Sequence, residues 1–146
     1  MKTGRILAVA GVVLALAAFR PFFGGGLGKP TPERIQRMAT ERVNDIMDDL
    51  DGTPDQRKAV HLMKDELLKD GRVLHEDQQK AREELVAQWD SPKMDGARVH
   101  AVVDERVDAM RRFAHTVADK VLELHTILTP EQRAKVSEQV KERSRW

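Results

Sequence analysis

The chain has 146 residues, of which 34% are charged and 4% aromatic, and it contains no Tyr and no Cys. This length allows at most one ordinary domain, and the composition favours a helical, strongly solvated protein whose thin core would gain from dimerisation. The missing cysteines exclude disulfides and thiolate metal sites. A net charge of +1 without a basic block gives no support for nucleic-acid binding.

The first 17 residues have the pattern of an export signal. Lys2 and Arg5 form a basic start, an apolar run of thirteen residues covers 6–18, and a small-x-small cleavage site ends the run. The run is shorter than the roughly 20 residues needed to span a bilayer. We therefore predict a signal peptide over 1–17 and a periplasmic protein. The alternative is an uncleaved inner-membrane anchor with the protein facing the periplasm.

Glycines and prolines make residues 18–31 a linker. A Thr-Pro start and apolar residues at helical spacing predict a first helix from Pro32 to about Asp51. The same start at Thr53 opens a second helix that ends near Trp89. The glycine of Asp70-Gly71 weakens its middle and predicts a bend or a break there. The main apolar stripe of this second helix is Val60, Met63, Leu67, Leu74, Ala81 and Leu85.

A turn at 91–96, with Asp95 as a cap, makes the second helix and a third one an antiparallel hairpin. The third helix is predicted over 97–128, and Thr129-Pro130 then starts a fourth that runs to about Arg143. Apolar residues of the third helix recur at steps of four and three, as in the packing seam of a coiled coil. They are Val103, Val107, Met110, Ala114, Val117, Val121, Leu124 and Leu128.

No segment alternates apolar and polar residues in the way of a strand. The predicted fold is therefore all-α, with four helices around a long antiparallel helical hairpin in one domain over 32–143.

The most specific signal is a repeated motif. Leu128-Thr129-Pro130-Glu131-Gln132 is followed by an arginine, and Thr53-Pro54-Asp55-Gln56, also followed by an arginine, lies 76 positions earlier. Thr-Pro followed by an acid is a good helix start in any helical protein. Two copies that flank a helical hairpin behind an export signal resemble the LTxxQ-motif family of periplasmic proteins. The second copy matches fully, whereas the first has Gly52 where the motif has Leu.

This family includes Spy/CpxP-like chaperones and ZraP/CnrX-like heavy-metal sensors. The resemblance covers residues 32–143 and implies a curved, cradle-shaped homodimer in the periplasm. The function expected from it is that of an ATP-independent, chaperone-like envelope-stress protein that holds unfolded or misfolded envelope proteins. The alternative is a sensor or buffer of zinc, nickel or cobalt that signals to a membrane-bound partner, and a third reading is a helical scaffold without a client.

A second stripe of the third helix alternates apolar and basic residues. It could be a partly buried flank in which cationic stems cover apolar surface, or a contact surface for a dimer partner or an unfolded client. We predict the contact surface. The stripe consists of Val99, Arg106, Phe113, Lys120 and Ile127.

Metal binding and catalysis receive less support. Three histidines precede an aspartate by four residues, which puts an imidazole and a carboxylate on one helix face. His61 and His125 lie level if the hairpin folds about residues 93–94, so they are the candidate pair for a divalent transition metal. The alternative is that His61 faces away, since it follows Val60 of the main apolar stripe. No phosphate-binding glycine loop or serine nucleophile motif occurs, so we expect no enzymatic activity and no other cofactor. The three pairs are His61 with Asp65, His100 with Asp104, and His115 with Asp119.

Overall fold

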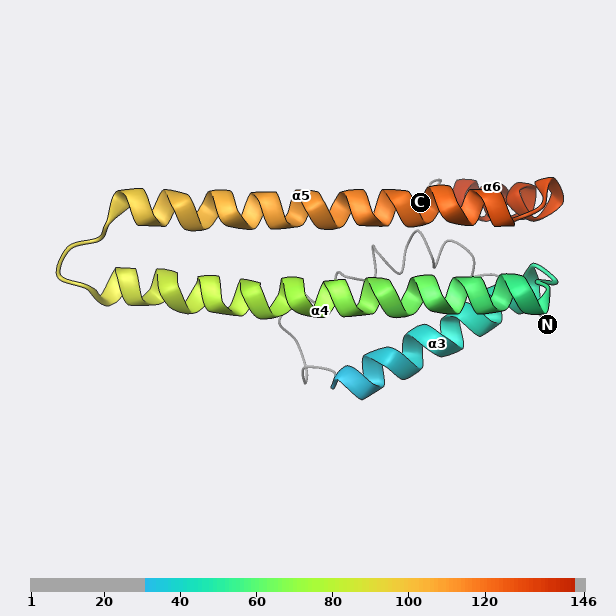
Figure 1. The fold of residues 1–146 in the computed structure, drawn as a ribbon, viewed down its shortest axis with the longest axis horizontal. Coiled ribbons are helices and arrows are strands. Elements are labelled where there is room, and N and C mark those ends of the chain that lie inside the picture. The colour runs from blue at the N-terminus through green and yellow to red at the C-terminus, as the bar shows by residue number, and fades with distance from the viewer. Residues whose placement is uncertain (1–30, 144–146) are drawn as a thin grey trace. The chain divides into compact units, whose positions relative to one another are not determined.

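In a computed structural model of the protein, residues 31–143 are described and form four α-helices without a strand (Figure 1). The prediction of an all-α fold is thus confirmed. The signal peptide predicted over 1–17 and nearly all of the linker over 18–31 lie outside the described residues. Of the helices described, none has the length and apolar character needed to cross a membrane. The helices are α3 (Pro32–Asp49), α4 (Pro54–Asp90), α5 (Gly96–Ile127) and α6 (Pro130–Arg143).

The helices begin where the sequence places their caps. The Thr31 hydroxyl accepts from the Arg34 backbone N–H at 3.3 Å and caps α3, which has proline in its first turn. The Asp95 carboxylate accepts from the Arg98 backbone N–H at 3.1 Å and caps α5. These bonds satisfy donors that a helix start would otherwise leave unpaired.

The end of α3 is a tight reversal. Asp51 takes the positive φ of 52° that such an ending requires. The Gly52 N–H donates to the Met47 carbonyl at 2.8 Å, and the Asp51 N–H donates to the Asp48 carbonyl at 3.1 Å. This bond pattern is a Schellman motif. The predicted end at Asp51-Gly52 is confirmed, with the left-handed residue being the aspartate rather than the glycine.

Helix α4 continues through Asp70-Gly71 without a break, so a break predicted there is wrong. The stretch around Gly71 carries helix-favouring residues such as Leu67, Leu68 and Leu74, and one glycine costs only about 1 kcal/mol in a helix interior. Such a cost is small in a helix of 37 residues.

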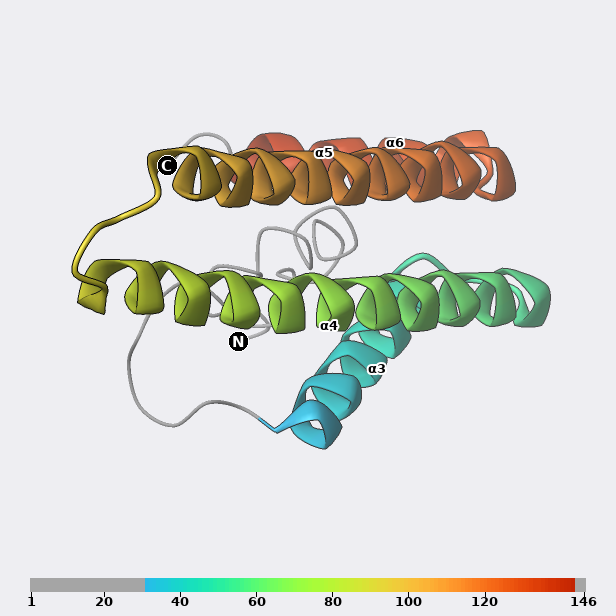
Figure 2. The ribbon, with the colours of Figure 1, turned by 60° about the vertical axis from the view of Figure 1, so that its left-hand side comes forward.

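Packing divides the helices into two compact units. Unit 1 contains α3, the start of α4, the end of α5 and α6, which are residues 31–66 and 120–143. Unit 2 spans Leu67–Asp119 and contains the remaining, antiparallel lengths of α4 and α5 with the turn between them (Figure 2).

Unit 1 has a hydrophobic core that joins its helices. One cluster unites Ile46 of α3 and Leu50, which follows α3, with Leu128, which follows α5, and Val136 of α6 packs against it. A second cluster unites residues of α3 with Val60 of α4. Leu124 of α5 contacts both clusters, so the end of α3 and the end of α5 are buried in the core of unit 1. The second cluster consists of Val43, Met47 and Val60.

Unit 2 buries much less. Its only buried hydrophobic side chains, within the part of the chain that the structure describes, are Ala81 and Val102. The Arg98 guanidinium of α5 bonds the Glu84 carboxylate of α4, with an Nη2–Oε2 distance of 2.7 Å, and also reaches Glu105 at 3.0 Å. Two buried apolar side chains and a half-buried ion pair between α4 and α5 therefore hold this hairpin.

Candidate functional site

The two motif copies meet side chain to side chain in unit 1. The Gln56 Nε2 donates to the Gln132 Oε1 at 2.9 Å, and the Gln132 Nε2 lies 3.1 Å from the Gln56 Oε1. The sequence predicts two separate motifs, and the structure joins them in a single hydrogen-bonded pair. Gln132 is 7% exposed and is the only buried polar residue among the described ones.

Each glutamine also closes a capping box at the start of its own helix. The Thr129 N–H donates to the Gln132 Oε1 at 2.9 Å, and the Gln132 N–H donates to the Thr129 Oγ1 at 3.3 Å. Thr53 and Gln56 make the equivalent bonds at 2.9 and 3.2 Å. Both sets of bonds are reciprocal capping boxes, which the Thr-Pro-x-Gln spacing favours.

Each glutamine finally reaches the end of a helix that belongs to the other copy. The Gln56 Nε2 donates to the Ile127 carbonyl at 2.7 Å, at the end of α5. The Gln132 Nε2 donates to the Leu50 carbonyl at 3.1 Å, just after α3. Because helix ends leave carbonyls without intrahelical partners, each motif starts one helix and finishes another.

The arginine after each glutamine extends this symmetry, and sequence reasoning missed its role. Arg57 donates to the carbonyls of Gly52 and Met47, both at 3.0 Å. Arg133 donates to the carbonyls of Leu128 at 2.7 Å and His125 at 3.2 Å. A cation that bonds the last carbonyls is favoured by the helix dipole. The Gln-Arg shared by the two copies was the available signal.

The glycine in the first copy has a steric reason. Leu128 of the second copy is 5% exposed and belongs to the core. A Cβ atom on Gly52 would collide with the side-chain methyl of Met47, which is 1% exposed. Met47 therefore fills the space beside Gly52, and the first copy can depart from the family pattern without leaving a cavity.

The predicted packing seam of α5 is wrong over residues 103–114 of unit 2. Val103, Val107 and Met110 are 48%, 51% and 41% exposed, and Ala114 is exposed too. The seam prediction holds from Val117 onwards, where Val117, Val121 and Leu124 are half-buried and Leu128 is buried. In unit 2 only one stripe of α5 can face α4, and that stripe includes the largest apolar side chain of the helix, Phe113.

The stripe that we predicted as a contact surface is half-buried at each of its five positions. Val99, Arg106, Phe113, Lys120 and Ile127 all have this intermediate exposure. The Lys120 ammonium of α5 pairs with Glu66 of α4 and lies 3.1 Å from Glu123, and these partners raise its pKa. The Arg106 Nη1 is buried without a hydrogen-bond partner among the described residues. The cationic stems thus cover apolar surface inside the hairpin.

The open apolar surface of α5 is therefore the neighbouring stripe. We call Val103, Val107, Met110 and Ala114 the exposed stripe. Their spacing of four, three and four residues is that of a coiled-coil seam. An apolar row of this length in solvent is typical of a protein interaction site.

The Asn44 amide competes with a metal ion for His61, one of the two predicted metal-binding histidines. The His61 Nε2 lies 2.9 Å from the Asn44 Oδ1. Partial burial and the nearby charges of Lys64 and Arg57 lower its pKa, which favours the neutral imidazole that metals bind. The carboxylate of Asp65 is engaged by Gln36 at 2.8 Å and Lys64 at 3.0 Å, and His125 is exposed. A metal bridge between His61 and His125 stays a prediction.

Residues 31–143 of one chain contain no group of three or more His, Asp or Glu side chains placed to share a metal ion. A site of the kind that holds zinc with three or four protein ligands thus has no single-chain candidate in this range. The five histidines of the chain lie on α4 and α5.

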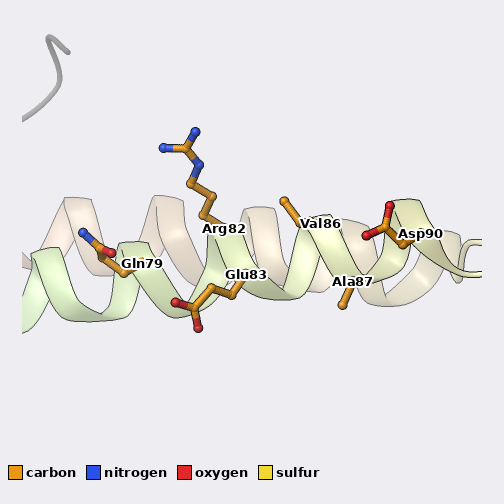
Figure 3. A pocket seen from close by; sticks show the side chains of 6 residues that line it. All are labelled: Gln79, Arg82, Glu83, Val86, Ala87 and Asp90. Carbon is orange, nitrogen blue, oxygen red and sulfur yellow. The ribbon is translucent and has the colours of Figure 1, made fainter. Parts of the chain in front are cut away.

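A hollow of about 520 Å³ runs along α4 in unit 2 (Figure 3). All of its lining residues lie on one helix face, and charges of both signs are among them. Without a second wall it cannot enclose a ligand in the way that small-molecule sites do. The lining residues are Gln79, Arg82, Glu83, Val86, Ala87 and Asp90.

Comparison with known protein families identifies the family to which the chain belongs. A family model described as heavy-metal resistance matches residues 5–135, a range that includes both motif copies. Searches of curated proteins and of solved structures gave no match. The family covers the LTxxQ group that the motifs resemble. The matched range takes in most of the 146 residues, and the chain therefore belongs to the heavy-metal resistance family.

Proposed function

We propose that this chain is a heavy-metal-responsive protein of the cell envelope that works without catalysis. The family match over 5–135 carries the proposal. The export-signal pattern at the N-terminus supports a periplasmic location, and imidazole and carboxylate side chains on α4 and α5 suit zinc, nickel or cobalt. On this proposal the metal is the signal or the cargo, and the protein binds it reversibly.

The structure supports a response in which the metal changes how chains associate, rather than one in which a single chain encloses the metal. One chain supplies no three-ligand group within residues 31–143, and the exposed stripe of α5 offers a contact surface. We propose that the protein forms a homodimer and passes the metal signal to a membrane-bound partner. A metal that binds one association state better than another shifts the population toward that state.

The experiment is a titration of the purified protein with zinc, nickel and cobalt, followed by calorimetry and by sedimentation. We expect saturable binding accompanied by a change in sedimentation. Magnesium serves as the control, because it prefers oxygen ligands and keeps its water. Absence of binding by all three metals up to millimolar concentration would overturn the proposal.

A second candidate function is the holding of unfolded envelope proteins, and the exposed stripe favours it. Met110 offers an adaptable apolar contact, and Arg111 and Arg112 lie beside it on the exposed part of α5. Because the stripe predicted for clients is half-buried, we place client contacts on the exposed stripe instead. Spaced apolar groups among cations can hold a partly folded chain by many weak contacts.

The test is aggregation of a denatured model protein with and without this chain, in zinc and in chelator. Met110→Glu should reduce protection from aggregation. Leu122→Glu is the matched control, because Leu122 is 65% exposed on the same helix but lies off the stripe. Absence of protection by the unchanged protein would remove the client-holding function, and equal protection by both variants would remove the exposed stripe as its site.

A further inference from the structure

We propose that two copies of this chain pair antiparallel through the exposed stripe of α5 and thereby build two identical metal sites. Each site takes His100 and Asp104 from one copy and His115 from the other. This inference rests on the proposed function, because it locates the metal of that response.

The surface that pairs is the exposed stripe. Val107 is the most exposed of the stripe's three large residues, at 51%, in the middle of unit 2. The other face of α5 packs in the hairpin through Val102, which is 1% exposed. His100 continues the stripe by one step toward the start of α5, because it precedes Val107 by seven residues. A seam of this spacing is completed by a second helix.

Charge selects a second copy in antiparallel orientation. Asp104 and Arg111 flank the stripe on one side, and Arg106 flanks it on the other. In a parallel pair, residues from opposite flanks meet, so Arg111 would find no acidic partner, because the other flank carries Val99, Arg106 and Phe113. In an antiparallel pair, residues from the same flank meet, so Asp104 faces Arg111 of the second copy twice. Attractive flanking charges fix orientation in such seams, and a self-complementary patch gives a two-fold dimer.

The apolar residues fix the register. A two-fold axis between Asp108 and Ala109 brings Val107 level with Met110 of the second copy, and Val103 level with Ala114. All four stripe residues then have apolar partners. With a rise of about 1.5 Å per residue, Asp104 and Arg111 of the second copy lie within roughly 3 Å of each other along the axis.

The same register brings the His100–Asp104 pair of one copy close to the His115–Asp119 pair of the other. His115 of the second copy falls midway between His100 and Asp104, about 3 Å along the axis from each. His115 lies on the flank that carries Asp104 and Arg111, since it follows Arg111 by four residues. Asp119 follows His115 by four residues and can orient its ring, as carboxylates behind metal-bound histidines do.

These side chains are available in the single chain. His100, Asp104, His115 and Asp119 are all exposed, and within residues 31–143 none of them has a hydrogen bond or an ion pair. Two imidazoles and one carboxylate, with water at the fourth position, form a ligand set that suits Zn²⁺, Ni²⁺ or Co²⁺. Four apolar residues make a short interface, so metal should decide whether the dimer forms.

The test is sedimentation of the purified protein at micromolar concentration in zinc and in chelator. We expect zinc to shift the chain from monomer to dimer, and we expect His100→Ala and His115→Ala each to abolish the shift. His75→Ala is the matched control, because His75 lies in unit 2 on α4 and should leave the shift unchanged. Helical circular dichroism checks that the variants fold.

Mixing the two variants distinguishes a shared site from a single-chain site. A dimer of one His100→Ala chain and one His115→Ala chain keeps one intact site, so the mixture should dimerise in zinc and bind half as much metal per chain. Failure of the mixture to dimerise, or zinc-driven dimerisation of either variant alone, would overturn the inference. If both variants bind zinc like the unchanged protein, the site is wrong but the metal-responsive function stands. If the unchanged protein binds no metal, the function itself falls.

Orientation can be tested independently, because the chain has no cysteine. A mixture of Val103→Cys and Ala114→Cys chains should form a mixed disulfide dimer in zinc under mild oxidation. Self-linked dimers of each variant, with no mixed product, would show a parallel pair and contradict the proposal.

Discussion

The two units of this protein use the same two long helices but bury them to different extents. In unit 1, α3 and α6 add to α4 and α5, so core side chains such as Ile46, Met47 and Val60 are 1–2% exposed. In unit 2 only α4 and α5 are present, and apolar residues of α5 stay in solvent. The difference shows that a helix with two apolar stripes needs partners on two sides, and that one chain provides them at one end only.

The largest expected effect comes from a matched pair of methionines. Met47→Ala in unit 1 should lower the free energy of unfolding by about 2–5 kcal/mol, since it leaves a cavity in a closed core. Met110→Ala in unit 2, where the side chain is 41% exposed, should change it by about 0.5 kcal/mol or less. Urea unfolding at low micromolar concentration in chelator measures both. Equal losses would show that the two units do not differ in burial as described.

The glutamine pair sharpens the comparison within unit 1. Gln132→Ala removes the acceptor of the Thr129 N–H and the donor to the Leu50 carbonyl. Each buried group left unpaired costs about 1–3 kcal/mol. Because Gln56 and Gln132 bond each other, the double variant should cost less than the sum of the single ones. A double-mutant cycle by chemical denaturation measures this coupling, and strict additivity would contradict the shared network.

The capping threonines should give a smaller effect. Thr129→Ala removes one side of a capping box and should cost roughly 1 kcal/mol. Thr31→Ala is the control: Thr31 accepts one bond at 3.3 Å and has Arg34, not a glutamine, at the third helical position, so its loss should be smaller. Thermal unfolding compares the two. If Thr129→Ala left stability unchanged but abolished metal response or client holding, the motif would be a binding site rather than a structural one.

The smallest effect is a difference in acid response between the units. The Arg98 guanidinium holds the pKa of the Glu84 carboxyl below its usual range in unit 2. Hydrogen bonds from Lys64 and Gln36 do the same for the pKa of Asp65 in unit 1. A carboxyl with a lowered folded pKa stabilises the fold above its unfolded pKa, and this contribution is lost as the pH falls.

Glu84→Gln should therefore flatten the acid response of unit 2, and Asp65→Asn that of unit 1. Amide hydrogen exchange across a pH series, corrected for intrinsic rates, separates the two units. Unchanged acid response in both variants would show that these contacts do not couple protonation to folding.

Local rules allowed the helices and caps to be predicted well from the sequence. Thr-Pro starts and turn residues act within a few positions, so the starts of α3, α4 and α6 coincide with the predictions. The capping boxes of Thr53 and Thr129 were predictable for the same reason. The bond between Gln56 and Gln132 was not, because it depends on how residues 76 positions apart meet in the fold.

The buried face of α5 could not be predicted from periodicity alone. Two stripes one residue apart, through Val107 and through Arg106, share the same seven-residue repeat. The more apolar stripe was chosen, whereas the structure turns the stripe with Phe113 and the long cationic stems toward the hairpin. Hydropathy counts an arginine as polar, but its stem packs like an apolar chain.

We propose that unit 2 is incomplete in one chain and is completed by a second copy and a metal. Hydrogen exchange with and without zinc tests it most directly, since burial of the exposed stripe should slow opening of the surrounding helix. We expect zinc to slow exchange along residues 100–115 of α5 and to leave the core of unit 1, around Met47 and Val60, unchanged. Protection that appears around His61 instead, or no zinc effect at all, would contradict the claim.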